Sequence, residues 1–188
     1  MAEYTLNIRS THSERLLPAV ESLLADADIQ LTDLGGLAVV TGPGSFTGLR
    51  IGLAAAKGFA YALDLPLIGV TVLQSLARQV HDSSAIVCPL VDSRRREVYA
   101  QAFRAGEPLQ EPFNGPLDTF LQWCQERSEP IVFCGDASIL HEEHIRSRVK
   151  HSCFPAVEQR VLRSAAAAGL GRELLLRGRK DDPMTLVP

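Results

Sequence analysis

The chain has 188 residues, which is enough for one large domain or two small lobes. Apolar residues make up 46% of it and charged residues 22%, a globular mixture that excludes a disordered chain. Its formal net charge of −3 excludes a general attraction to nucleic acid, so any role near RNA needs a local basic patch or a partner that binds RNA.

The first residues predict a strand and then a capped helix. Residues 5–9 alternate polar and apolar side chains, as a half-buried strand does. Thr11 and Glu14 have the spacing of a capping box, which predicts a helix from Thr11 to Ala27. Its apolar side chains recur on one face, a stripe that ordinarily belongs to the core, with a partner-facing stripe as the alternative. The stripe consists of Leu16, Leu17, Val20, Leu23, Leu24 and Ala27.

A glycine-rich turn follows the next strand. Residues 37–40 are a short apolar run, typical of a strand covered on both faces. The turn over residues 41–48 leads to a helix predicted from Leu49 to Leu63, rich in glycine and alanine. Glycine inside a helix costs up to about 1 kcal/mol, so we expect close packing by another helix to offset that cost. We then predict a buried strand over residues 67–70 and a helix capped by Thr71.

The following segment predicts a boundary between two lobes. A change of composition at residues 81–84 separates an N-terminal lobe, residues 1–82, from a C-terminal lobe, residues 83–188. In the second lobe we expect two strands joined as a hairpin, and then a loop, a helix, a strand and a long helix. Strands that alternate with helices predict an α/β protein. These elements are expected over residues 85–91, 96–103, 106–116, 117–127, 131–134 and 161–177.

The glycine-rich turn has two interpretations. A helix N-terminus behind such a turn can hold a phosphate through its free N–H groups. The known fingerprints are absent, because Leu-Arg follows Gly48 where a P-loop has Lys and Ser or Thr, and Thr47 replaces a glycine of dinucleotide-binding turns. The plainer alternative is a tight turn that needs glycine for its backbone. The residues of a nucleotide-facing turn would be Gly42, Gly44, Ser45, Thr47 and Gly48.

No catalytic residue, metal ligand or cofactor is predicted. His12 stands alone, whereas a metal site needs further ligands. His141 and His144 lack the H-E-x-x-H spacing of zinc proteases, and a solvated helix start explains them. Ser45 lies in GPGSFTG rather than the G-x-S-x-G of hydrolases. The four cysteines form no C-x-x-C pair, which argues against structural zinc and a disulfide scaffold.

The chain also lacks the marks of membrane or export targeting. No apolar run approaches the roughly 18 residues that span a membrane. The first residues open directly into a strand-like pattern, without a secretory leader. We therefore expect a cytoplasmic protein with no membrane partner.

Longer strings are more specific than any of these patterns. GPGSFTGLRIG, AKG and PLIGV, which lie between residues 42 and 70, resemble the hallmark region of the TsaB/YeaZ family. HSERLLP at residues 12–18 is similar to that family's first helix, and DSRRREVY at residues 92–99 is similar to its hairpin. The resemblance covers about residues 3–103 and is loose afterwards.

The resemblance implies a two-lobed α/β fold of the actin, Hsp70 and sugar-kinase type (ASKHA), in a cytoplasmic bacterial protein. It implies a non-catalytic subunit that activates TsaD, the metal-carrying transferase that places threonylcarbamoyl on adenosine 37 of tRNA. The ATPase TsaE is implied as a further partner, and contact with tRNA is implied to be indirect. The alternatives are a nucleotide-binding ATPase of the sugar-kinase-like fold and, from an older label of the family, an M22-type glycoprotease.

The implied interface is a helical face that docks TsaD or, in a homodimer, a second copy of the chain. It combines the apolar stripe of the first helix with the small side chains of the helix after the glycine-rich turn. The residues expected there are His12, Leu16, Leu17, Val20, Leu24, Arg50, Ala54, Ala55 and Gly58.

The chain departs from the family pattern in three places. Met1 falls where the family's third strand begins, so two strands are missing, and the chain stops before a C-terminal segment that members usually have. Two missing strands would leave a sheet edge exposed. Arg96 stands where glycine is usual, which predicts backbone strain there if the turn needs a positive φ.

Overall fold

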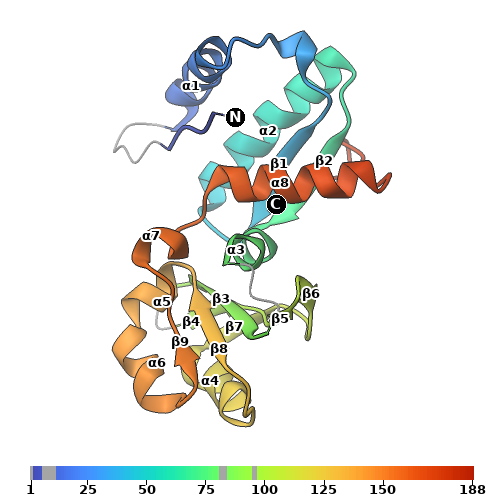
Figure 1. Ribbon diagram of the computed structural model, residues 1–188. Coiled ribbons are helices and arrows are strands. Elements are labelled where there is room, and N and C mark those ends of the chain that lie inside the picture. The colour runs from blue at the N-terminus through green and yellow to red at the C-terminus, as the bar shows by residue number, and fades with distance from the viewer. Residues whose placement is uncertain (1, 6–11, 81–83, 95–96) are drawn as a thin grey trace. The chain divides into compact units, whose positions relative to one another are not determined.

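The computed structural model describes residues 2–5, 12–80, 84–94 and 97–188. The chain forms two compact units (Figure 1): unit 1 comprises residues 1–71 and 163–188, and unit 2 comprises residues 72–162. These bounds differ from the lobes expected from the sequence, which met between residues 82 and 83. The C-terminal helix packs on unit 1, and the helix at residues 72–80 packs in unit 2.

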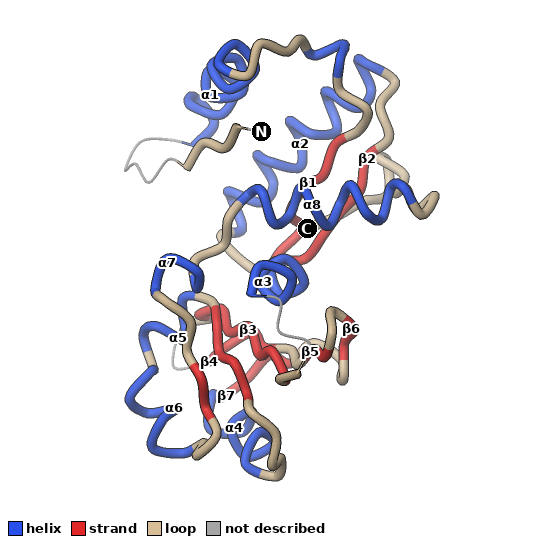
Figure 2. The backbone as a smooth tube through the Cα atoms, in the orientation of Figure 1, coloured by secondary structure: helices blue, strands red, loops and turns tan. Residues whose placement is uncertain are grey.

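Unit 1 is a two-stranded parallel sheet with helices around it (Figure 2). The strands pair in register, with Leu37 opposite Leu67 and Val40 opposite Val70. Among the described residues, the other edge of the first strand has no strand partner. The elements are α1 (His12–Asp26), a 3-10 turn (Leu31–Asp33), β1 (Leu37–Gly42), α2 (Phe46–Leu63), β2 (Leu67–Thr71) and α8 (Ser164–Leu176).

The sheet of unit 1 has a helix on each face. Val39 of β1 packs with Leu53 of α2 on one face. On the other face Ala38 and Ile68 lie against Gly171 of α8, where a Cβ atom added to the glycine would be 2.4 Å from the Cβ of Ala38. Only glycine allows α8 to come this close to the strand.

Unit 2 is a mixed sheet centred on β3 (Ile86–Asp92). This strand pairs antiparallel with β4 (Glu97–Ala100) and β5 (Phe103–Arg104), and parallel with β8 (Ile131–Cys134). The other elements are α3 (Val72–Val80), β6 (Glu107–Pro108), β7 (Phe113–Pro116), α4 (Leu117–Gln125), α5 (Asp136–Leu140), α6 (Glu142–Arg148), β9 (Ser152–Cys153) and α7 (Val157–Arg160).

Both faces of β3 are buried, as its continuous apolar sequence requires. Ile86 and Leu90 face a core that contains Phe120 of α4 and Ile145 of α6. Val87 and Val91 turn to the opposite face, where the core includes Leu73, Leu76 and Ala77 of α3. The unit is therefore a sheet between helical layers.

Most of the predicted elements are confirmed, with shifts at their ends. The α/β class is confirmed, and α1 spans nearly the predicted residues 11–27. The strand predicted over residues 5–9, the cap at Thr11 and the strain at Arg96 lie at least partly outside the described residues. Arg94, which the structure describes, has a positive φ of 65°. The loop predicted over residues 106–116 is wrong in part, because β6 and β7 pair with β5 and β4 there. No described helix is long and apolar enough to cross a membrane.

Candidate functional site

The glycine-rich turn between β1 and α2 is shaped by a serine cap. The Oγ atom of Ser45 accepts a hydrogen bond from the Gly48 amide at 3.4 Å, and its carbonyl accepts one from the Leu49 amide at 2.9 Å. This N-cap starts α2 at Phe46, three residues before the predicted start at Leu49. Thr47 and Gly48 therefore belong to the first turn of the helix.

The same geometry accounts for part of the glycine content of the turn. Gly42 is buried with φ at +127°, a conformation that other residues rarely adopt. The Gly48 amide, which a phosphate could have used, is already bound by Ser45. Gly44 and Thr47 are exposed. A nucleotide-facing turn at these residues stays a prediction.

The outer face of α2 carries a stripe of exposed side chains. Leu53 and Ala60 are the buried residues of this helix. A Cβ atom added to Gly58 would meet no described atom within 4 Å, and the Arg50 guanidinium lies 3.7 Å from the centre of the Phe46 ring. We call this surface the α2 stripe; it consists of Phe46, Arg50, Ala54, Gly58 and Tyr61.

The sequence prediction found only part of the α2 stripe. It named Arg50, Ala54 and Gly58, but it missed Phe46 and Tyr61, whose side chains are 65% and 89% exposed. Their spacing of one or two helical turns from the predicted residues was the signal that could have found them. The predicted Ala55 is half-buried at the side of the stripe.

The first helix lies against the same element. α1 contacts α2, so the two predicted helices belong to one unit. Leu16, Val20 and Leu24 are half-buried and Leu17 is 55% exposed, so the apolar stripe of α1 is only partly covered. The side chain of His12 lies outside the described residues. The predicted interface residues that can be placed thus come from two adjacent helices.

The structure places several histidines and cysteines named in the sequence analysis. No three or more His, Cys, Asp or Glu side chains in the part of the chain that the structure describes could hold a metal ion. His141 precedes α6 as its N-cap, and His144 contacts Asp118 at 2.8 Å. Burial raises the pKa of the Cys88 and Cys134 thiols, which keeps both protonated and weakly nucleophilic.

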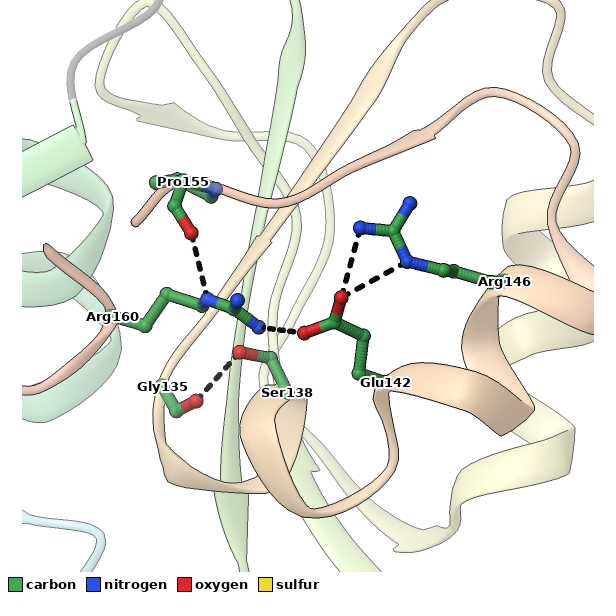
Figure 3. Close-up of polar contacts among 6 residues, drawn as sticks. All are labelled: Gly135, Ser138, Glu142, Arg146, Pro155 and Arg160. Carbon is green, nitrogen blue, oxygen red and sulfur yellow. Dashed lines mark hydrogen bonds and ion pairs between the residues drawn. The ribbon is translucent and has the colours of Figure 1, made fainter. Parts of the chain in front are cut away.

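Unit 2 contains a charge cluster that sequence reasoning missed (Figure 3). The buried Arg160 donates to the Pro155 carbonyl at 2.8 Å and to Glu142 at 2.5 Å. Arg146 donates to the other oxygen of Glu142 at 2.8 and 3.0 Å. The hydrogen bonds of Arg160 and then of Arg146 lower the pKa of Glu142. The cluster ties α7, and the segment before it that contains Pro155, to α6.

The sequence of the chain is similar to proteins of tRNA modification. A family model described as TsaD, tRNA N6-adenosine threonylcarbamoyltransferase, matches residues 4–118. The tRNA threonylcarbamoyladenosine biosynthesis protein TsaB of Bacillus subtilis is 34% identical over 178 residues, which cover 92% of this chain and 78% of that protein. The protein of the same name from Escherichia coli is 39% identical over 98 residues, which cover 51% of this chain and 42% of that protein.

Solved structures show the same fold. YeaZ from Pseudomonas aeruginosa superposes with a TM-score of 0.77 at 23% identity, covering 98% of this chain and 86% of that one. A second structure from that organism, of an uncharacterized protein similar to peptidase YEAZ, gives a TM-score of 0.74 at 23% identity and covers 96% and 84%. The chain therefore has the α/β fold of YeaZ. Since the sequence matches extend over most of its length, the chain belongs to the TsaB/YeaZ family.

Proposed function

We propose that this chain is a non-catalytic subunit that binds and activates TsaD, the transferase that places threonylcarbamoyl on adenosine 37 of tRNA. The reaction takes place in the cytoplasm, with TsaE as a further partner and tRNA held mainly by the other subunits. The proposal is supported by membership of the TsaB/YeaZ family, whose curated members are named for tRNA threonylcarbamoyladenosine biosynthesis.

The observation that carries the proposal is the α2 stripe. A helix interior with glycine loses stability, and Gly58 has no described neighbour within 4 Å that would explain its small size. A partner helix can approach closely at Gly58 and at the exposed Ala54, which lie one turn apart on the same face. Phe46 and Tyr61 provide the exposed aromatic side chains that anchor protein interfaces.

The neighbouring α1 extends this face. Leu17 is exposed, and the half-buried Leu16 and Val20 leave part of their apolar surface to solvent. Together the two helices form the docking surface that we assign to TsaD. A second copy of the chain can use the same surface when TsaD is absent, so the two complexes exclude each other.

The α2 stripe can be tested with a matched pair of arginine substitutions. Ala54→Arg places a long cation on the stripe, and we expect it to abolish binding to TsaD and stimulation of tRNA modification. Ala54 suits this test better than Ala55, which is half-buried. The control is Ala168→Arg, at an exposed alanine of α8 in the same unit.

Binding is measured by calorimetry and modification by nucleoside analysis of tRNA after incubation with TsaD. Normal binding and stimulation by Ala54→Arg would show that the α2 stripe is not the interface. Equal loss in Ala168→Arg would trace the effect to the fold of unit 1 rather than to the stripe.

A further inference from the structure

A basic hollow opens where two helices of unit 2 end. Its volume is about 320 Å³, and four of its seven lining residues are basic while none is acidic. Arg127 follows the end of α4, Arg148 ends α6, and Lys150 and His151 form the turn before β9. For a chain with a net charge of −3, this is a local reversal of charge.

The cations of the hollow differ in how closely a carboxylate approaches them. Arg127 lies 3.5 Å from the exposed Glu126, a loose surface pair. Among the described residues, Lys150 and His151 have no carboxylate within ion-pair distance. Arg148 reaches Asp118 only at 3.9 Å, and that carboxylate is held more closely by His144. Cations around a concave surface focus the electrostatic potential, so the hollow attracts anions.

Arg127 lines the hollow and contacts an aromatic ring. Its guanidinium lies 3.6 Å from the centre of the Trp123 ring, and it donates to the Trp123 carbonyl at 3.1 Å. The ring of Trp123 stacks in turn on Phe120, which is buried in the core. The guanidinium is therefore held by an aromatic ring and by a backbone carbonyl. A planar cation held in this way is a surface on which a nucleic-acid base can stack.

The walls of the hollow are held in place before any ligand binds. The side chain of Gln125 donates to the Arg148 carbonyl at 2.8 Å and ties α4 to the end of α6. The His151 carbonyl accepts from the Ile131 amide of β8 at 2.9 Å. The backbone that carries the cations is thus fixed to two neighbouring elements.

We propose that this hollow binds RNA directly, with Arg148, Lys150 and His151 at the phosphates and Arg127 under one unstacked base. The combination favours RNA over an acidic protein segment, because a carboxylate would use the cations but not the flat face of Arg127. The proposal goes beyond the function proposed above, from which it takes only tRNA as the RNA of interest.

A different role of the same cations has to be separated from RNA binding. Basic side chains near helix C-termini stabilise the helix, and α4 and α6 both end here. That role predicts that charge reversal lowers the thermal midpoint of unfolding and leaves RNA affinity unchanged. RNA binding predicts that charge reversal lowers RNA affinity and leaves the thermal midpoint unchanged.

The test is a titration of a fluorescently labelled tRNA anticodon stem-loop with the full chain, followed by anisotropy at several salt concentrations. We expect Lys150→Glu to weaken binding on the order of tenfold and to reduce the dependence of affinity on salt, since at least one phosphate contact is lost. Arg127→Lys keeps the charge but loses the flat face, so we expect about fivefold weaker binding with an unchanged salt dependence. The control, Arg179→Glu in unit 1, should bind like the parent chain.

Three results would overturn the proposal. The first is no binding at low salt, and the second is equal affinity of the parent chain and Lys150→Glu. The third is that polyglutamate binds as tightly as RNA and is lost with the same variants, which would assign the hollow to an acidic protein. Because TsaD is absent from the titration, none of these results bears on the docking surface at the α2 stripe.

Discussion

Arg160 and Arg146 bind the same carboxylate from different environments (Figure 3). The side chain of Arg160 is 6% exposed and that of Arg146 is 53% exposed. We expect Arg160→Ala to lower the free energy of unfolding of unit 2 by about 1–3 kcal/mol, because the Pro155 carbonyl loses its donor and the packing of the guanidinium is lost. Arg146→Ala should have a clearly smaller effect, since an exposed ion pair contributes little.

Urea denaturation of the two variants measures this difference. Equal destabilisation would mean that the burial of Arg160 adds nothing to the contact. A larger loss for Arg160→Ala than for Arg146→Ala would mean that the cluster of Figure 3 holds α7 in place.

Glu3 binds the start of α8 through contacts whose strength depends on pH. Its carboxylate accepts from the Ala165 amide at 2.9 Å, from Ser164 at 3.0 Å and from Arg163 at 2.6 Å, at the start of α8. The Ala165 amide is the largest of the contacts that lower its pKa from 4.5. A carboxyl whose folded-state pKa is lowered adds stability above its unfolded pKa, and this is lost as the pH falls through the folded value.

We therefore expect Glu3→Gln to lower the thermal midpoint of unfolding at pH 7. The difference from the parent chain should shrink below pH 4.5 and vanish once Glu3 is protonated in the folded state. Thermal melts of both proteins across this range provide the measurement. A difference that is constant with pH would show that the charge of Glu3 plays no part.

At the scale of the element, two helical glycines serve opposite purposes. Gly171 lets α8 approach Ala38, whereas Gly58 has no described neighbour within 4 Å. Gly171→Ala should lower the free energy of unfolding by about 1–3 kcal/mol through overpacking. Gly58→Ala should raise it by about 0.5–1 kcal/mol, because alanine is the better helix former.

Chemical denaturation of the two variants compares them directly. A stable Gly171→Ala would mean that α8 can move away from the sheet without cost. A destabilised Gly58→Ala would show that this part of α2 is packed within the chain, and the α2 stripe would then not be free for a partner.

The sequence predicted elements where local patterns dominate. The apolar runs of β1, β2 and β8 and the periodic face of α1 are confirmed. The start of α2 was missed because Ser45 was interpreted as part of the turn rather than as a cap. β7 was taken as loop because Pro and Gly obscure its pattern; it is a strand because it pairs with β4, with Phe113 opposite Ala100. Pairing of this kind depends on residues distant in the sequence, which no local pattern contains.

At the scale of the molecule, the division into two units depends on long-range contacts. The composition change at residues 81–84 was a plausible boundary, but α3 completes the core around Val87 and Phe103, and α8 returns to the first sheet. The candidate interface, inferred from small residues and family resemblance, stays a prediction. The basic hollow was not predicted, because Arg127 and Lys150 meet only through the fold.

The most direct test of the proposed function is size-exclusion chromatography with light scattering on the chain and TsaD from the same organism, separately and mixed. We predict a new species with the mass of a heterocomplex, formed at the expense of free TsaD and of any homodimer of the chain. Unchanged elution of both proteins, with the chain folded by circular dichroism, would contradict the assignment of this chain as a TsaD-binding subunit.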